Sequence, residues 1–171
     1  TAHYRNATGG YNVVIGYTAG REHIGSYAVL IGNSAGYYAT ASNNVFVGAD
    51  AGKGNDSEPY SSGGKNVGIG YESQKNFTTG QYNTSVGHQS LVSNSTGGRN
   101  TSLGYRALYG SSGNSTNSNV AIGSDSLYSI STGGYNVAVG DNALYGLTSG
   151  NYSVGIGWQA GQYNIGSQNV L

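Results

Sequence analysis

Residues 119–126 read NVAIGSDS, and 17 residues later the chain repeats this stretch as NVAVGDNA at residues 136–143. An aliphatic residue followed by glycine recurs along the whole chain, and the spacings between these glycines are 16, 16, 22, 17, 17, 19, 17 and 17 residues. The glycines of this series are Gly16, Gly32, Gly48, Gly70, Gly87, Gly104, Gly123, Gly140 and Gly157. A nearly constant period of this length is typical of a repeat protein whose units stack on one another.

Each repeat contains one short strand. We number the repeat from its glycine, which is position 0; position −3 is then β-branched in all nine repeats and position −1 is aliphatic. An apolar run of four or five residues fits a strand and is too short for a helix. A strand that returns in the same phase predicts a coil of parallel strands, because an antiparallel meander would alternate direction. We therefore predict an all-β fold, a parallel β-solenoid of about ten 17-residue turns, with residues 1–171 as a single array.

The two faces of the strand are both apolar or small. We expect the rows at −3 and −1 to form the core, and the opposite row at −2 to meet neighbouring chains. The expected core residues are Val13, Ile15, Val29, Ile31, Val45, Val47, Val67, Ile69, Val86, Leu103, Val120, Ile122, Val137, Val139, Val154 and Ile156. Position −4 is asparagine in seven repeats, and in-register asparagines can bond from turn to turn as side-chain ladders do in stacked strands. The expected ladder residues are Asn12, Asn44, Asn66, Asn83, Asn100, Asn119 and Asn136.

The longest spacing between glycines contains residues 53–65, which include the only proline and several charged residues. Insertions in a solenoid leave the coil as loops, so we expect an outward loop here. Both ends of the chain fall in the middle of a repeat, from which we expect the array to be part of a longer one.

Composition argues against catalysis. Charged residues are 8% of the chain, the net charge is zero and cysteine is absent. The four acidic residues that follow the repeat glycine lie in different turns, and His3, His23 and His88 lie in distant repeats. We therefore predict no enzyme activity, no metal, no cofactor and no nucleic-acid partner. No apolar run is long enough to span a membrane.

Tyrosine is unusually frequent, with 16 residues. Tyr17, Tyr71, Tyr105 and Trp158 share position +1 and form a candidate contact surface. These rings could bridge neighbouring chains or bind a carbohydrate or host receptor, and the sequence leaves both open. Glycosylation sequons in outer turns give a further set of candidate sites: Asn6, Asn55, Asn76, Asn94 and Asn114.

The stretches at 119–126 and 136–143 resemble the YadA-type head repeat of trimeric autotransporter adhesins, and residues 100–109, NTSLGYRALY, are similar to repeats of phage tail-fibre proteins. The resemblance covers essentially the whole chain. It implies a left-handed β-roll, three chains around a common axis, and an extracellular location on a cell or virion surface.

The expected function is that of a non-enzymatic structural protein, a rigid rod in a fibre that serves surface attachment. The expected partners are copies of the same chain, in a homotrimer or a stacked fibre, and a host-surface receptor or glycan. Two alternatives remain: a receptor- or glycan-binding adhesin head, and the scaffold of a glycosylated extracellular fibril.

Overall fold

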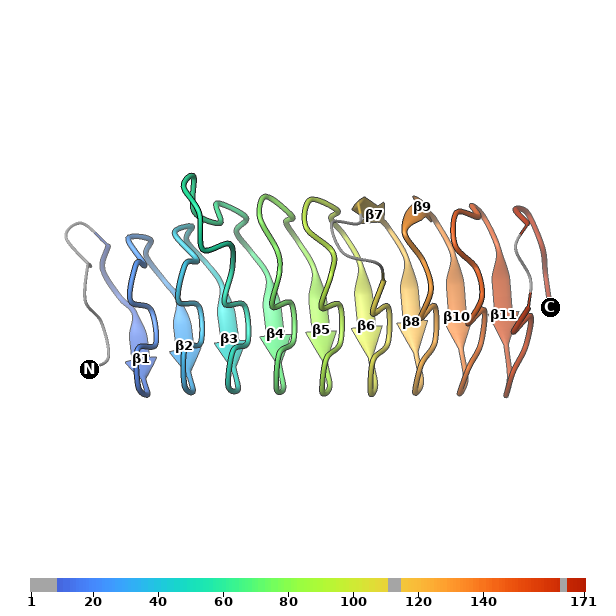
Figure 1. Cartoon of the computed structure of the whole chain (residues 1–171), viewed down its shortest axis with the longest axis horizontal. Coiled ribbons are helices and arrows are strands. Elements are labelled where there is room, and N and C mark those ends of the chain that lie inside the picture. Colours follow the sequence, from blue (N-terminus) through green and yellow to red (C-terminus); the bar gives the residue numbers. More distant parts are fainter. Residues whose placement is uncertain (1–8, 111–114, 164–165) are drawn as a thin grey trace.

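The computed structural model describes residues 9–110, 115–163 and 166–171. Its main sheet has nine parallel strands stacked along a rod, as Figure 1 shows. In order they are β1 (Val13–Ile15), β2 (Val29–Ile31), β3 (Val45–Val47), β4 (Val67–Ile69), β5 (Thr84–Val86), β6 (Thr101–Leu103), β8 (Val120–Ile122), β10 (Val137–Val139) and β11 (Val154–Ile156). A second, parallel pair consists of β7 (Ser115–Asn117) and β9 (Thr132–Gly134). The described residues contain no helix.

The predicted all-β class and parallel solenoid are confirmed. Each strand covers positions −3 to −1, and neighbouring strands pair in register, as in the alignment of Val120 with Val137. The coil has about 8 turns, fewer than the ten expected from the sequence.

The predicted core was assigned to the wrong face of the strand. The residue at −2 points into the coil and is buried, as for Leu30, Phe46 and Ala138, while those at −3 and −1 lie on the outer face of the sheet. Val13 and Ile15, for example, are 47% and 57% exposed. A three-residue strand alternates its side chains, so only the middle one can enter the narrow coil.

The interior is filled from the far side of each turn, by positions +3, +4 and +7. Small residues such as Ala107 stand at +3, leucines such as Leu108 at +4, and Phe77 and Ile130 at +7, all of them buried. These positions form two separate apolar clusters, one around Leu30 and Phe46 and one running from Leu91 to Leu147.

A polar seam separates the two clusters. The Oγ atoms of Ser73 and Ser85 lie 2.6 Å apart, and the side-chain amide of Gln74 donates to Ser85 Oγ at 2.9 Å and to the carbonyl oxygen of Val67 at 2.8 Å. All three polar side chains are buried. The core therefore changes character between β3 and β6.

The glycine at position 0 closes each turn against the next. At Gly104 the φ angle is +138°, and a Cβ atom there would lie 2.5 Å from the carbonyl oxygen of Gly123 in the following turn. Glycine is required here by conformation and by space, as the sequence predicts for a corner.

The asparagine ladder is present along the coil. The backbone N–H of Asn119 donates to Asn100 Oδ1 at 3.0 Å, and the Asn100 side-chain amide donates to the carbonyl oxygen of Thr116 at 2.7 Å. The same pattern continues through Asn136, whose Oδ1 accepts from the N–H of Ser153 at 2.9 Å. The ladder joins each turn to the next through groups that burial removes from water.

Candidate interaction surfaces

The outer face of the main sheet is flat, regular and apolar. Side chains at −3 and −1 form two rows along the rod that are aliphatic except for Thr84 and Thr101 at −3, and no position in either row is charged. Ile69, Leu103 and Ile156 are 39%, 47% and 63% exposed. Nine strands at about 4.8 Å spacing, each about 10 Å long over its three residues, give a face of about 430 Å². A contiguous apolar patch of several hundred Å² is rare on monomeric soluble proteins and is typical of an interaction site.

The predicted contact residues border this face on one side. Tyr17, Tyr71, Tyr105 and Trp158 are exposed by 69%, 45%, 47% and 74%, all in the row at +1. Tyr71 and Tyr105 belong to one aromatic stack, because His88 lies between them at ring-centroid distances of 4.9 and 5.5 Å. Tyr17 follows β1 and Trp158 follows β11, the two end strands of the main sheet, so both lie away from this stack. The structure thus brings together two of the four predicted residues.

A second tyrosine row, at −5, borders the other side of the face and was not predicted as a contact surface. Its members are Tyr11, Tyr27, Tyr82, Tyr135 and Tyr152. All are at least 50% exposed and adopt left-handed φ angles of 56° to 61°. The constant spacing of these tyrosines before each strand was a signal in the sequence, but their backbone conformation is rare for residues other than glycine, asparagine and aspartate.

Rings in the −5 row stack along the rod. The Tyr135 and Tyr152 rings are 5.2 Å apart and 9° from parallel, and those of Tyr11 and Tyr27 are 5.1 Å apart and 6° from parallel. Lys65 Nζ lies 4.9 Å over the Tyr82 ring and donates to its hydroxyl at 2.9 Å. This hydrogen bond lowers the pKa of Tyr82.

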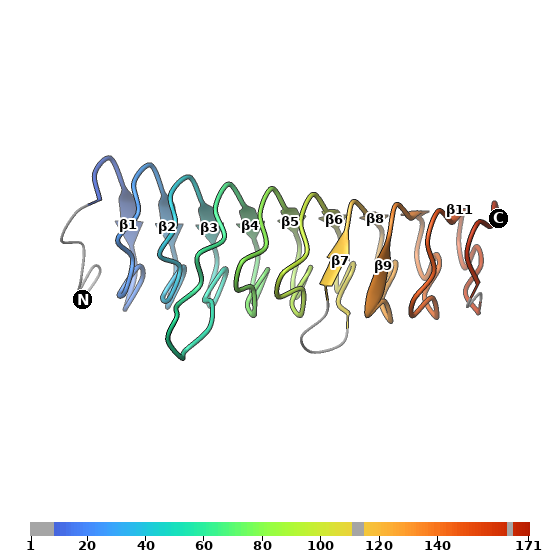
Figure 2. The same cartoon turned by 90° about the horizontal axis from the view of Figure 1, so that it is seen from above.

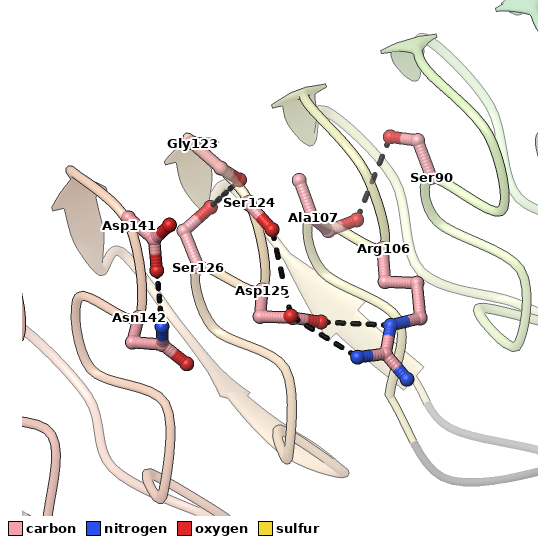
Figure 3. A network of polar contacts seen from close by, with 9 residues as sticks. All are labelled: Ser90, Arg106, Ala107, Gly123, Ser124, Asp125, Ser126, Asp141 and Asn142. Carbon is pink, nitrogen blue, oxygen red and sulfur yellow. Dashed lines mark hydrogen bonds and ion pairs between the residues drawn. The ribbon is translucent and has the colours of Figure 1, made fainter.

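Three of the four carboxylates just after the repeat glycine are held in ion pairs, and the fourth, Asp141, accepts a hydrogen bond from the Asn142 side-chain amide. Asp125 bonds Arg106 in the preceding turn, with Oδ1 2.8 Å from Nε and Oδ2 3.1 Å from Nη2, as Figure 3 shows. Glu72 pairs with Lys75 at 2.6 Å, and Asp50 with Lys53 at 3.6 Å. Burial alone would raise the pKa of Glu72, but hydrogen bonds from Lys75 and Gln89 outweigh it, so that the pKa is lowered. Each of the three paired carboxylates therefore has its own cation.

A polar groove runs along the corner between the −5 row and the turns beneath it. Its volume is about 590 Å³. It is lined by Thr79, Gln81, Tyr82, Thr96, Gly98, Arg99, Ser115, Asn117, Ser118, Gly133, Gly134, Tyr135 and Asn151. These residues come from five successive turns of the coil.

The loop at residues 53–65 leaves the coil between β3 and β4, as Figure 2 shows. Ser61 fastens its return, because its Oγ accepts from the N–H of Asn55 at 2.7 Å and donates to the carbonyl oxygen of Phe77 at 2.6 Å. The Tyr60 and Tyr38 rings stack at 5.3 Å, and a smaller polar pocket of about 240 Å³ lies beside Tyr38 and Lys53.

The candidate glycosylation sites differ in accessibility. Asn76 is exposed and Asn55 is half-buried. Asn94 is 2% exposed, and its side chain bonds the carbonyl oxygen of Gly97 and the N–H of Thr116. Asn94 stands at +7, a position that points into the coil, so its prediction as an outer-turn site was wrong. Asn6 and Asn114 lie outside the described residues.

Among the residues that the structure describes, no three His, Cys, Asp or Glu side chains gather into a site for a metal ion. No helix in this part of the chain is long and apolar enough to cross a membrane. Comparisons with protein-family models, with curated proteins and with solved structures give no match.

Proposed function

We propose that the chain is a non-enzymatic structural segment of an extracellular or virion fibre, in which three copies associate side by side through the outer faces of their main sheets. The observation that carries this proposal is the pair of aliphatic rows at −3 and −1. They stay half-exposed along the rod, although their side chains are those of a protein core.

The area and symmetry of the face suit several copies of the same chain. The sheet face of about 430 Å² per chain is about half of the roughly 800 Å² that each partner buries in a standard interface, and the bordering aromatic row at +1 enlarges it. In a three-fold arrangement of left-handed rolls, each face would meet two neighbours at the axis. The aromatic row at +1 borders the face on one side, so its rings would add contact area between neighbouring chains.

Attachment of the fibre to a surface is part of the same proposal. The protruding loop at residues 53–65 supports a role as an adhesin head, and removal of residues 55–60 should then abolish attachment while the rod stays folded. Exposed Asn76, in an Asn-Phe-Thr sequon, supports the alternative of a glycosylated fibril scaffold.

Sedimentation velocity tests the side-by-side assembly. The unaltered chain should sediment as three chain masses, and a variant carrying Ile69→Lys and Leu103→Lys should shift toward one chain mass. Both positions are already partly exposed, so the lysine stems can lie along the sheet and the circular dichroism spectrum should not change. Thr148→Lys, on an exposed turn outside this face, is the matched control and should leave the trimer intact. A monomeric unaltered chain would contradict self-association, and a dimer would contradict the three-chain arrangement.

A further inference from the structure

The polar groove at the −5 corner has the charge and lining of a binding site. None of its 13 lining residues is acidic, and Arg99 is its only charged one. Among the described basic side chains, Arg99 and Lys65 are the two that take part in none of the ion pairs found. They stand in the −5 row on either side of Tyr82, so an uncompensated positive charge lies at this end of the groove.

The tyrosines at the two ends of the groove each have one covered ring face. Lys65, in the turn before, covers one face of Tyr82, and Tyr152, in the turn after, covers one face of Tyr135. Tyr82 and Tyr135 both line the groove, so the other face of each ring is the one that a ligand there can reach. The two faces are separated by the turns that carry Arg99 and Ser118.

Ser118 interrupts the row of large side chains. Arg99 and Tyr135 are two turns apart, which is about 10 Å along the rod, and between them only the short side chain of Ser118 stands in the −5 row. The resulting notch is one turn thick, which is enough for one flat ring, and lies between Tyr135 on one side and Arg99 on the other.

The rest of the lining can bond hydroxyl groups. Gln81 and Asn117 contribute side-chain amides, and Thr79, Thr96 and Ser115 contribute hydroxyls. Asn117 Oδ1 accepts from the N–H of Gly98 at 2.9 Å, and its side-chain amide donates a long hydrogen bond of 3.5 Å to the carbonyl oxygen of Ser115. An amide has two N–H groups, so Asn117 keeps donor capacity for a ligand. Aromatic faces with convergent amides and hydroxyls are the chemistry that recognises a sugar ring, whose C–H face is apolar and whose edge is polar.

We propose that this groove binds an acidic carbohydrate, with a sugar ring stacked on Tyr135 in the layer of Ser118 and a carboxylate paired with Arg99. A guanidinium is suited to such a carboxylate because it can bond both oxygens at once. A nucleic acid fits the site less well, since its binding depends on neutralising many phosphates, and the groove supplies one cation, Arg99, with Lys65 two turns before it in the −5 row.

This site is separate from the proposed interface, because it lies at the corner and in the turns and not on the aliphatic rows. It can therefore be tested in whatever assembly the chain forms, and its failure would not affect the fibre proposal. A contact between copies at this groove would instead show as a change of sedimentation when the groove is altered.

Isothermal titration calorimetry on the full chain, with defined probes, tests the proposal. The carboxylated probes are tetragalacturonic acid and a trisaccharide that ends in sialic acid, each compared with its methyl ester; oligothymidylate is the nucleic-acid probe. At least one carboxylated probe should bind. Its methyl ester should bind with an affinity lower by about tenfold or more, because the ester cannot form the charged hydrogen bond to Arg99.

Two variants with a matched control locate the binding. Ser118→Tyr completes the row and should abolish binding; the same row accepts tyrosine at five places with nearly the same φ, so the fold should be kept. Asn43→Tyr places a tyrosine in this row outside the groove and should leave binding unchanged. Arg99→Gln should weaken the carboxylated probe about tenfold and leave its ester unaffected.

The proposal is overturned if neither carboxylated probe binds, if Ser118→Tyr leaves binding intact, or if the ester binds as well as the acid. It is also overturned if oligothymidylate binds more tightly than either sugar and is lost in the same variants, or if Ser118→Tyr changes the sedimentation of the chain instead of sugar binding.

Discussion

Phe46 fills the space that the missing side chain of Gly52 leaves inside the third turn. A Cβ atom at position 52 would lie 2.3 Å from Cγ of the Phe46 ring. The same relation holds in most turns: where position −2 is large, as in Leu30 and Phe46, position +4 is glycine, and where −2 is small, as in Ser102 and Ala121, position +4 is leucine. The last turn departs from it, with glycine at both positions. In the turns that follow this relation, one large side chain fills the interior, either from position −2 or from position +4.

This relation predicts strong coupling between the two positions. Phe46→Ala alone should cost about 3 to 5 kcal/mol because it leaves a cavity, and Gly52→Leu alone about 1 to 3 kcal/mol because it overfills the turn. The double variant should lose less free energy of unfolding than the two single losses added together, by about 1 kcal/mol or more. The reason is that it recreates the combination of a small residue at −2 and leucine at +4 found at Ala121 and Leu127. Urea unfolding of the four proteins measures this. Phe46→Ala combined with the distant Leu144→Ala should be additive, and additivity in the first cycle would contradict the volume argument.

Gln74 occupies a buried position where later turns carry leucine. Its Oε1 atom is buried and has no hydrogen-bond partner among the described residues. Gln74→Leu should therefore raise the free energy of unfolding by about 1 kcal/mol, since it removes an unsatisfied acceptor and leucine adopts the same left-handed φ at Leu91. The reverse change, Leu127→Gln, should cost about 2 kcal/mol or more. Thermal unfolding checks both, and a clear loss of stability in Gln74→Leu would show that the polar seam itself is stabilising.

The ladder residue Asn100 should be costly to replace. In Asn100→Ala the N–H of Asn119 and the carbonyl of Thr116 lose their partners inside the coil, so we expect a loss of about 2 to 4 kcal/mol. Asn12, at the first strand and only half-buried, has a single acceptor bond to Ala28 and one donor bond to Gly25. Asn12→Ala should cost about 1 kcal/mol, and equal effects in chemical denaturation would contradict burial as the cause.

The repeat glycines offer a test of conformation against crowding. Gly104 and Gly157 have similar φ angles of +138° and +125°, but a Cβ at 104 would meet a carbonyl oxygen at 2.5 Å, while nothing lies within 4 Å of one at 157. Gly157→Ala should cost about 1 to 2 kcal/mol for backbone strain alone, and Gly104→Ala distinctly more, because two turns must separate. The melting temperatures of the two variants give the comparison, and equal values would mean that strain dominates.

The ionisation of Tyr82 should respond to Lys65. The pKa of Tyr82 is lowered from 10.0, first by its hydrogen bond from Lys65, whereas the nearby charge of Glu72 raises the pKa of Tyr71. A folded pKa below the unfolded value means a stabilising contribution that is present at alkaline pH, above the unfolded value, and is lost as pH falls through the folded one. In a titration by tyrosine NMR signals, Lys65→Met should move the Tyr82 midpoint upward and leave Tyr71 unchanged. An unmoved Tyr82 midpoint would contradict the contact.

The period and the strand positions could be predicted because both follow from residues that the backbone demands. Glycine at the corner and β-branched residues beside it specify strand and turn without knowledge of packing. The inward face could not be chosen in the same way, because Val120 and Ile122 look like core residues and Ala121 like a surface one. The deciding signal was the inverse size of positions −2 and +4, which becomes meaningful only when the two positions are known to face each other.

The candidate contact residues were predicted only in part for a related reason. Tyr17, Tyr71, Tyr105 and Trp158 are exposed as expected, but the −5 tyrosines were overlooked because φ angles near +60° are uncommon for tyrosine. Asn94 shows the opposite error. A sequon in a serine-rich stretch suggests an outer turn. Asn94, however, stands at position +7 of its repeat, the same position as Phe77 and Ile130, and its side chain lies inside the coil.

The ladder bonds between turns run along the rod, which determines how it would respond to pulling from its ends. Tension along the rod acts with the same force on every junction between turns. The breaking force is therefore that of the weakest junction and does not grow with the number of turns. The polar seam at Ser73, Gln74 and Ser85 interrupts the apolar interior, and a stretched rod should yield first at this seam. A fibre built from such rods would lengthen in one early step and still keep both flanking blocks folded.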